Sequence, residues 1–267
     1  MSSCAAMPPL LRSLRPHQWP KNSFVLLPLV FAGQLADPTA LGRALLAFTA
    51  FCAASSSVYL LNDIRDREQD RLHPLKKLRP IASGALSLAI AKVTAVVLAG
   101  AALASGLALG IEFTLLVGAY LALNLAYSFG LKHVVILDVM SIAIGFVLRV
   151  LAGGAAITVP VSSWLLLCTI FLALFLAFSK RRHELGLLEE SASAQRQVLD
   201  QYSPVFLDQM INVVTSSTVL AYALYAISPE TIDRFHTRNL IFTMPMVLFG
   251  VFRYLYLIYQ RPGERNP

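Results

Sequence analysis

Long apolar stretches separated by short polar connections dominate the chain. Each stretch has roughly 17 to 23 residues, the length that a helix rising about 1.5 Å per residue needs to cross a hydrocarbon core of about 30 Å. Because lipid cannot hydrogen-bond to backbone groups, several such stretches in one chain predict a bundle of transmembrane helices. We predict eight spans: 23–36, 41–61, 88–109, 112–129, 134–157, 162–179, 210–228 and 239–259.

The first predicted span is the weakest. It is short, it contains Pro28, and an interfacial segment with the sequence Arg15-Pro16-His17-Gln18-Trp19-Pro20-Lys21-Asn22 precedes it. We therefore expect a tilted or half-inserted helix there.

The composition agrees with a membrane protein. Of the 267 residues, 57% are hydrophobic and 14% are charged, whereas about a quarter of the residues are charged in soluble domains. The first fourteen residues lack the pattern of a signal peptide, so we expect the N-terminus to be retained. The three cysteines, Cys4, Cys52 and Cys168, lack metal-binding spacing and are expected to be small apolar residues. The sequence predicts an all-α polytopic bundle forming a single domain over residues 1–267.

The basic residues predict the topology. Alternate connections carry most of the Lys and Arg residues: Arg12, Arg15, Lys21, Arg65, Arg67, Arg71, Lys76, Lys77, Arg79, Lys132, Lys180, Arg181, Arg182, Arg196, Arg261 and Arg265. The opposite side carries Arg43, Arg234 and Arg238. The positive-inside rule then makes both termini cytoplasmic. The net charge of +7 is explained by this rule and by anionic lipid headgroups, so no nucleic-acid partner is expected.

An acidic segment ends the second predicted span. On a helix that turns about 100° per residue, Asn62, Asp66, Asp70 and Asp63 fall at about 0°, 40°, 80° and 100°, whereas Glu68 lies at about 240°. Carboxylates this close repel one another unless a cation lies between them, and Mg²⁺ prefers such oxygen ligands. The alternative is a solvated helix end whose acids pair with neighbouring arginines, namely Arg65, Arg67 and Arg71.

A basic loop follows the acidic segment. It contains His73-Pro74, Lys76-Lys77 and Arg79-Pro80-Ile81-Ala82-Ser83-Gly84. Lys and Arg side chains beside a metal site are suited to phosphate oxygens. The alternative explanation of the loop is the positive-inside rule alone.

These motifs resemble the UbiA superfamily of intramembrane prenyltransferases. The likeness lies in Asn62-Asp63-x-x-Asp66-x-x-x-Asp70 followed by Arg79-Pro80, and in Tyr127-x-x-x-x-Lys132. It implies a helical bundle with a lipid-accessible cavity and a polar cytoplasmic cap, in which Asn62, Asp63, Asp66 and Asp70 bind Mg²⁺ and a diphosphate. Superfamily members usually have nine spans, so either a ninth helix is absent or the sequence stops before it. We favour the second interpretation, because Gly263–Pro267 resembles a loop.

The chain departs from the superfamily pattern after the sixth predicted span. Where a second acidic motif is usual, it reads Phe178-Ser179-Lys180-Arg181-Arg182-His183-Glu184-Leu185. Exchanging carboxylates for cations predicts that an anion is bound directly. This is similar to the branch of decaprenyl-phosphate phosphoribosyltransferases, which is also matched by Leu14-Arg15-Pro16-x-Gln18-Trp19-x-Lys21-Asn22, Asn62-Asp63-x-Arg65-Asp66, Phe129-Gly130-Leu131-Lys132-His133 and Leu148-Arg149-x-x-Ala152-Gly153-Gly154.

The resemblance to this branch implies a reaction. Phosphoribosyl pyrophosphate would donate its 5-phosphoribosyl group to a polyprenyl monophosphate, releasing diphosphate, at the cytoplasmic face of a bacterial inner membrane, for the synthesis of a cell-envelope sugar donor. An anionic lipid phosphate needs positioning more than a general base. The predicted catalytic residues are Asp66, Asp70, Lys132 and Lys180.

The remaining candidate residues have predicted binding roles. Lys21, Lys77 and Arg79 are candidates for the donor phosphates, and Lys132, Lys180 and Arg181 for the acceptor phosphate. Tyr127 either hydrogen-bonds in the cap or belongs to the aromatic belt. Arg149, inside a span, is a further substrate-binding candidate that needs an interior partner. Asp138 either orients Lys132 or Arg149 or forms a plain intramembrane ion pair.

Two other functions compete with this interpretation. An ordinary prenyltransferase would join a prenyl diphosphate to an aromatic or quinone-precursor acceptor, but the second acidic motif is missing. A transporter would carry its polar residues near the midplane, whereas here they cluster at one face. The sequence leaves the lipid chain length and any homo-oligomer open.

Overall fold

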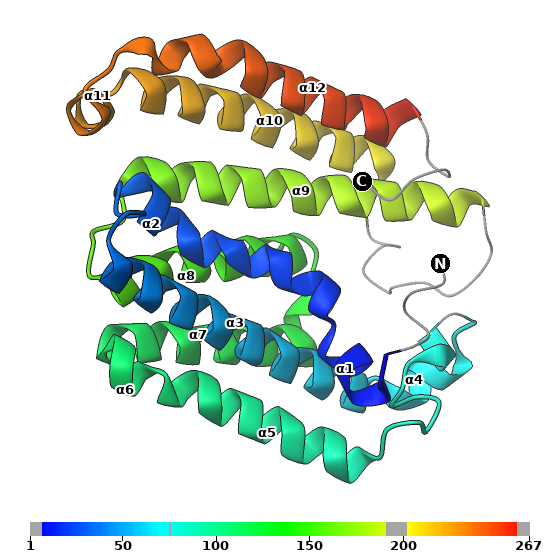
Figure 1. Cartoon of the computed structure of the whole chain (residues 1–267). Coiled ribbons are helices and arrows are strands. Elements are labelled where there is room, and N and C mark those ends of the chain that lie inside the picture. The colour runs from blue at the N-terminus through cyan, green and yellow to red at the C-terminus, as the bar shows by residue number, and fades with distance from the viewer. Residues whose placement is uncertain (1–6, 75, 191–201, 261–267) are drawn as a thin grey trace. The chain divides into compact units, whose positions relative to one another are not determined.

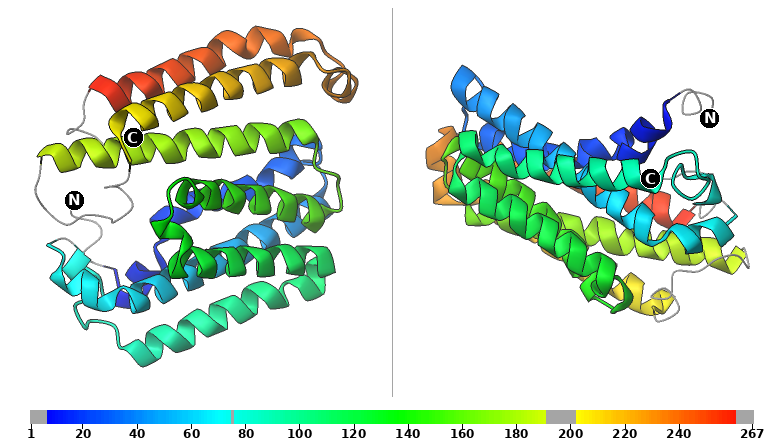
Figure 2. Two further views of the ribbon diagram at one scale, coloured as in Figure 1. Left: turned by 180° about the vertical axis from the view of Figure 1, so that it is seen from behind. Right: turned by 90° about the horizontal axis from the view of Figure 1, so that it is seen from below.

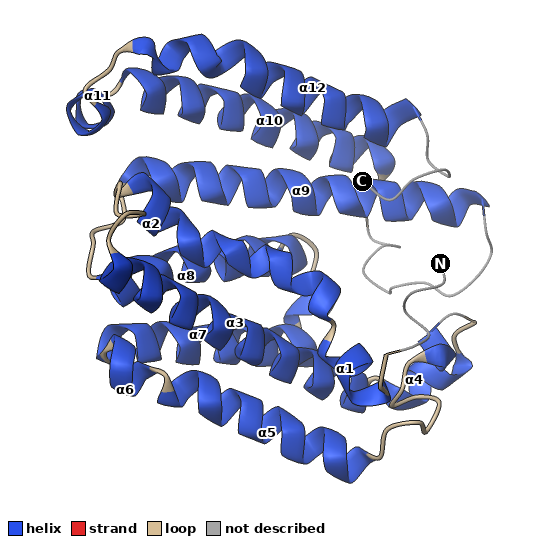
Figure 3. Cartoon of the chain, in the orientation of Figure 1, coloured by secondary structure: helices blue, strands red, loops and turns tan. Residues whose placement is uncertain are grey.

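The computed structural model describes residues 7–74, 76–190 and 202–260, and every regular element in this part of the chain is helical (Figure 3). Of the residues discussed above, Cys4, Arg196, Arg261, Arg265 and the segment Gly263–Pro267 lie outside it. The elements are α1 (Pro9–Leu14), η2 (Pro16–Leu26), α2 (Leu27–Phe31), α3 (Pro38–Arg65), α4 (Arg67–Leu72), η3 (Lys76–Leu78), α5 (Leu88–Ala104), α6 (Gly106–Leu109), α7 (Ile111–Phe129), η4 (Leu131–His133), α8 (Leu137–Ile157), α9 (Ser163–Glu190), α10 (Pro204–Ile227), α11 (Pro229–Phe235), η6 (Asn239–Thr243) and α12 (Met244–Gln260), where η marks a 3-10 helix.

Within the described residues, seven helical segments are long and apolar enough to cross a membrane. They are 38–65, 88–109, 111–129, 137–157, 163–185, 204–227 and 239–259. They coincide with seven of the eight predicted spans, which confirms the all-α transmembrane class. The predicted total of eight is not confirmed.

The segment predicted as the first span, 23–36, contains no long helix. It consists of the end of the 3-10 helix η2 and the five-residue α2. Pro16, Pro20 and Pro28 each remove a backbone donor, so an α-helix cannot run through them undistorted. This segment is therefore too short to cross a bilayer as one helix.

The chain forms two compact units, of which the first comprises residues 1–130 and 147–161. In this unit α3 packs against α5, α7 and η2 (Figure 1). Phe51 of α3 contacts the rings of Phe113 and Tyr120, with centroid distances of 6.2 and 5.3 Å. At Gly153 of α8 a Cβ atom would lie 2.0 Å from the Val25 carbonyl oxygen. Only glycine therefore lets η2 approach α8 this closely.

The second unit comprises residues 131–146 and 162–267, of which the structure describes the helices up to residue 260. Here α10 packs against both α9 and α12, and the three helices lie side by side (Figure 2). Its core includes Leu207 and Ile211, and the ring of Phe175 lies 5.2 Å from that of Tyr254. The outer face of α12 exposes Phe249 and Phe252, as expected for a helix that faces lipid.

Candidate functional site

The acidic segment spans a break between two helices. α3 ends at Arg65, and Asp66 separates it from α4. Helical hydrogen bonds continue across the break, because the Asp66 amide donates to the Asn62 carbonyl at 2.9 Å and the Asp70 amide to the Asp66 carbonyl at 2.8 Å. The helical spacing assumed from the sequence is therefore kept across the break.

Two arginines hold the buried carboxylates of this segment. Asp63 and Asp70 are each 3% exposed. Arg79 Nη1 lies 3.1 Å from Asp63 Oδ1 and 2.7 Å from Asp70 Oδ2, and Arg15 Nη2 lies 2.5 Å from the same Asp63 oxygen. Buried carboxylates need such charge-assisted partners. Two acids seven residues apart thus share one guanidinium.

The alternative interpretation expected the neighbouring arginines to pair with the acids of this segment. The contacts to Asp63 and Asp70 come from Arg15 and Arg79 instead. Arg67 and Arg71 both pair with Glu68, whose side chain is 74% exposed. Arg65 lies over the ring of Phe129, 4.0 Å from its centroid. Glu68 therefore points away from the buried acids, in agreement with its predicted angle on the helix.

The side chain of Asn62 contacts a serine of α7. Ser128 Oγ contacts Asn62 Oδ1 and also lies 2.8 Å from the Asn124 carbonyl oxygen. This contact brings the C-terminal end of α7, including the partly buried Tyr127, to the acidic segment. A lone serine carries no signal in the sequence, so this residue was missed.

The acidic segment has the donor chemistry that Mg²⁺ requires. No group of three or more His, Cys, Asp or Glu side chains that could hold a metal is formed in residues 7–74, 76–190 and 202–260. The segment nevertheless offers carboxylate and amide oxygens on one helical face, the ligands that Mg²⁺ prefers. The Arg79 guanidinium lies between Asp63 and Asp70, so these two carboxylates share one positive charge in this structure.

The basic loop supplies one side chain to the acids and leaves another at the surface. Arg79 reaches the acidic segment, whereas Lys77 is exposed. Arg71 Nε donates to the Ala82 carbonyl at 3.1 Å, which ties the loop back to α4. At His73 burial and then the nearby Lys76 charge lower the pKa of the imidazole, so this side chain adds no positive charge at neutral pH.

The N-terminal segment docks along α3 through buried polar contacts. Trp19 Nε1 donates to Ser56 Oγ at 3.1 Å, and Asn22 Nδ2 donates to Ser55 Oγ at 3.1 Å. These contacts account for polar side chains in the middle of an apolar helix. Lys21, between them in sequence, is exposed. The docking brings Arg15 to Asp63, a contact that the sequence analysis missed because the two residues are 48 positions apart.

Arg149 has interior partners in the first unit, as its place in a span requires. Its Nε donates to Asn22 Oδ1 at 2.9 Å and its Nη2 to the Tyr120 hydroxyl at 2.9 Å. The guanidinium carbon also lies 4.7 Å from the centroid of the Tyr120 ring. The side chain is 7% exposed. An amide, a phenol and an aromatic face therefore surround this cation.

The basic side chains of the second unit divide into exposed and buried ones. Lys180 is 63% exposed at its side chain and lies 3.8 Å from Glu184, and Lys132 is half-buried within η4. Arg181 is 1% exposed. Its Nε lies 2.8 Å from Asp138 Oδ2 and its Nη1 2.7 Å from Glu184 Oε2.

This division bears on two of the sequence hypotheses. Asp138 forms an ion pair with Arg181, which corresponds to the plainer of its two predicted roles. Arg181 is enclosed by carboxylates, so its predicted contact with an acceptor phosphate would require it to leave them. Lys180 points outward, because successive residues of a helix differ by about 100°.

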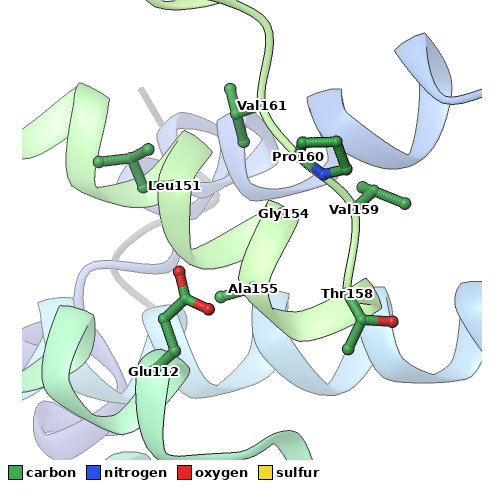
Figure 4. A pocket seen from close by; sticks show the side chains of 8 residues that line it. All are labelled: Glu112, Leu151, Gly154, Ala155, Thr158, Val159, Pro160 and Val161. Atoms are coloured by element: carbon green, nitrogen blue, oxygen red, sulfur yellow. The ribbon is translucent and has the colours of Figure 1, made fainter.

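A pocket of about 380 Å³ lies elsewhere in the first unit (Figure 4). It is lined by Glu112, Leu151, Gly154, Ala155, Thr158, Val159, Pro160 and Val161. Glu112 lies in the first turn of α7, whereas Ser128, which contacts Asn62, lies in its last turn. Sixteen residues of helix separate them, or about 24 Å. The pocket is therefore not part of the acidic site.

Fold and site together define an integral membrane protein of the helical-bundle class, with a buried acid and arginine cluster at the ends of its spans. The chain belongs to the UbiA prenyltransferase family, whose model matches residues 24–266.

Two relatives carry the same name. The chain is 39% identical over 227 residues to the decaprenyl-phosphate phosphoribosyltransferase of Mycolicibacterium smegmatis, covering 83% of this chain and 71% of the relative. It is also 39% identical over 224 residues to the enzyme of that name from Corynebacterium glutamicum, covering 81% and 66%. The chain thus spans about two thirds of the length of these curated relatives.

A solved structure has the same fold. A UbiA homolog from Archaeoglobus fulgidus bound to GPP and Mg²⁺ superposes with a TM-score of 0.76 at 20% identity, covering 95% of this chain and 88% of that one. This likeness supports the fold of the whole described chain.

Proposed function

We propose that the protein transfers the 5-phosphoribosyl group from phosphoribosyl pyrophosphate to a polyprenyl monophosphate of the decaprenyl type and releases diphosphate. The observation that carries the proposal is the 39% identity, over 83% of the chain, to an enzyme named for this lipid acceptor. The residue pattern supports it, because Lys180-Arg181-Arg182 stands where the superfamily usually has a second acidic motif.

The donor is assigned to the acidic segment of the first unit. Asn62, Asp63, Asp66 and Asp70 would hold Mg²⁺, which would neutralise charge that develops on the departing diphosphate. Arg79 lies between Asp63 and Asp70, where its guanidinium can turn to diphosphate oxygens once the carboxylates are otherwise engaged. Lys21 and Lys77, which are both exposed, are the further candidates for the donor phosphates.

The acceptor is assigned to the second unit. A lipid phosphate already carries the attacking oxygen in ionised form, so it requires orientation and no strong general base. Lys180 has the exposure that a contact with a membrane-bound phosphate needs, and Lys132 is the second candidate. As the phosphate oxygen bonds to the ribose C1, the bond from C1 to the diphosphate breaks, and the electron pair leaves with the diphosphate.

The distribution of basic residues supports a cytoplasmic location of this chemistry. The connections 62–84 and 180–201 carry ten of the 22 Lys and Arg residues and are proposed to face the cytoplasm of a bacterial inner membrane. A soluble, highly charged donor would reach the site from that side.

The experiment that tests the function is a direct comparison of substrates. Purified protein is incubated with Mg²⁺ and phosphoribosyl pyrophosphate, with and without polyprenyl phosphate, and diphosphate and lipid-linked phosphoribose are measured. A parallel reaction contains a prenyl diphosphate and 4-hydroxybenzoate. We expect acceptor-dependent diphosphate release in the first reaction only. A prenylated aromatic product would instead identify an ordinary prenyltransferase.

A further inference from the structure

A buried carboxylate joins three segments of the second unit. Asp138, at the start of α8, is 0% exposed. Its Oδ2 accepts from Arg181 Nε at 2.8 Å, and its Oδ1 accepts from the Tyr202 hydroxyl at 2.7 Å. A carboxylate this deeply buried depends on such partners. The partners lie 43 and 64 residues away along the chain, so Asp138 connects α8, α9 and the segment just before α10.

The Tyr202 hydroxyl makes a second contact, to a strained backbone position. It accepts a hydrogen bond from the Ile136 amide at 2.8 Å. Ile136 has φ 71°, a left-handed conformation that is unfavourable for a β-branched residue and persists only where its surroundings hold it. Tyr202 therefore holds this turn by its amide while donating its own proton to Asp138.

The protonation state of Tyr202 suits this role. Burial, followed by the hydrogen bond to Asp138, raises the pKa of the phenol above its ordinary value of 10.0. The hydroxyl consequently keeps its proton at neutral pH and can donate and accept at the same time.

The residues held by Asp138 and Tyr202 are close along the chain to the two lysines assigned to the acceptor. Lys132 lies four residues before Ile136, in a connection tightened by the hydrogen bonds from the Val134 amide to Leu131 and from the Asp138 amide to Val134. Lys180 directly precedes Arg181, which is the other partner of Asp138. The same buried contacts thus fix the backbone that carries each lysine.

We propose that Tyr202 is a positioning residue for the acceptor phosphate. It acts through Ile136 and Asp138 and fixes where Lys132 and Lys180 stand with respect to each other. This inference rests on the proposed function, which assigns the two lysines to the lipid phosphate. It predicts that loss of the hydroxyl alone impairs use of the acceptor and spares use of the donor.

The test is Tyr202→Phe in the full chain. The ring, 6.0 Å from that of Phe206, is retained and only the hydroxyl is removed. We expect the KM for polyprenyl phosphate to rise about tenfold, the effect of one lost hydrogen bond to a charged group, with the KM for phosphoribosyl pyrophosphate unchanged. The matched control is Tyr259→Phe, which removes a phenol contact of 2.9 Å to Asp208 in the same unit and should change neither KM.

A second substitution separates positioning from simple stability. Asparagine tolerates the left-handed conformation better than isoleucine does. Adding Ile136→Asn to Tyr202→Phe should therefore lower the KM for polyprenyl phosphate about threefold relative to Tyr202→Phe alone. If Tyr202 only stabilised the bundle, the KM for polyprenyl phosphate would be unchanged in both variants.

The outcomes distinguish this proposal from the proposed function. A wild-type protein that transfers no phosphoribose overturns both. An active wild type together with a normal acceptor KM in Tyr202→Phe overturns the positioning role alone, as does an equal rise in both KM values. A Tyr202→Phe protein that does not fold, judged by circular dichroism and gel filtration, also counts against it, since the packed ring is retained.

Discussion

The ion pair between Arg79 and Asp70 should stabilise the folded protein far more than the exposed ion pair between Arg71 and Glu68 beside it. The Nη1 to Oδ2 distance is 2.7 Å, and the side chains are 30% and 4% exposed. Breaking a fully buried pair costs about 3–5 kcal/mol, and the partial exposure of Arg79 reduces this through solvent screening. We therefore expect a coupling of about 2 kcal/mol between Asp70→Asn and Arg79→Gln in a double-mutant cycle.

The neighbouring pair provides a matched control. Arg71 and Glu68 lie 3.2 Å apart with side-chain exposures of 42% and 74%, so the cycle of Glu68→Gln and Arg71→Gln should give a coupling of about 0.3–0.5 kcal/mol. The hydrogen bond from Arg71 to Ala82 does not contribute to this coupling, because the single and the double variant that change Arg71 both lose it. The two cycles thus compare similar chemistry at different burial.

The assay is denaturant unfolding of the purified protein in detergent, with a chelator present so that metal binding does not contribute. Free energies of unfolding of the wild type, the single variants and the double variants give each coupling. Equal couplings in the two cycles, or a coupling near zero for Asp70 and Arg79, would refute the conclusion that burial makes this pair strong.

Three further results are expected. Asp66→Ala should abolish diphosphate release while the protein still inserts and unfolds normally, whereas Glu68→Ala should be mild because its side chain points outward; equal sensitivity of the two would contradict the helical geometry. Lys180→Glu should reduce use of the polyprenyl acceptor more than donor binding, measured as separate KM values, and the reverse order would count against the assignment of the acceptor. A single cysteine at Lys76 in a cysteine-free background should resist membrane-impermeant labels added to intact cells, and labelling from outside would overturn the proposed topology.

The spans were predictable because they depend on local properties. A stretch of about 20 apolar residues must become a helix in lipid whatever the rest of the chain does, and seven helices were found in this way. The exception was 23–36, which begins at the end of a 3-10 helix containing Pro16 and Pro20 and continues only as a five-residue α-helix. The face shared by Asp63 and Asp70, and the outward direction of Glu68, followed equally from helical geometry.

The partners of the charged residues were decided by the tertiary structure. The alternative drawn from the sequence named Arg65, Arg67 and Arg71 as local partners for the acids, but the N-terminal segment and the basic loop bring in Arg15 and Arg79 instead. Contacts between positions 48 residues apart leave no periodic signal, because they depend on how helices and loops pack and not on spacing within one helix.

Two adjacent residues of the second unit also differ in a way that the tertiary structure decided. Lys180 and Arg181 are adjacent long cations, and the sequence assigned both to the acceptor phosphate. A helix points adjacent side chains about 100° apart, so one can face solvent while the other faces the interior. The sequence by itself determined that the basic run Lys180-Arg181-Arg182 directly follows an apolar stretch. Only the packing of α8 against this helix, which buries Asp138, determined that Arg181 is the residue drawn inward and that Lys180 remains exposed.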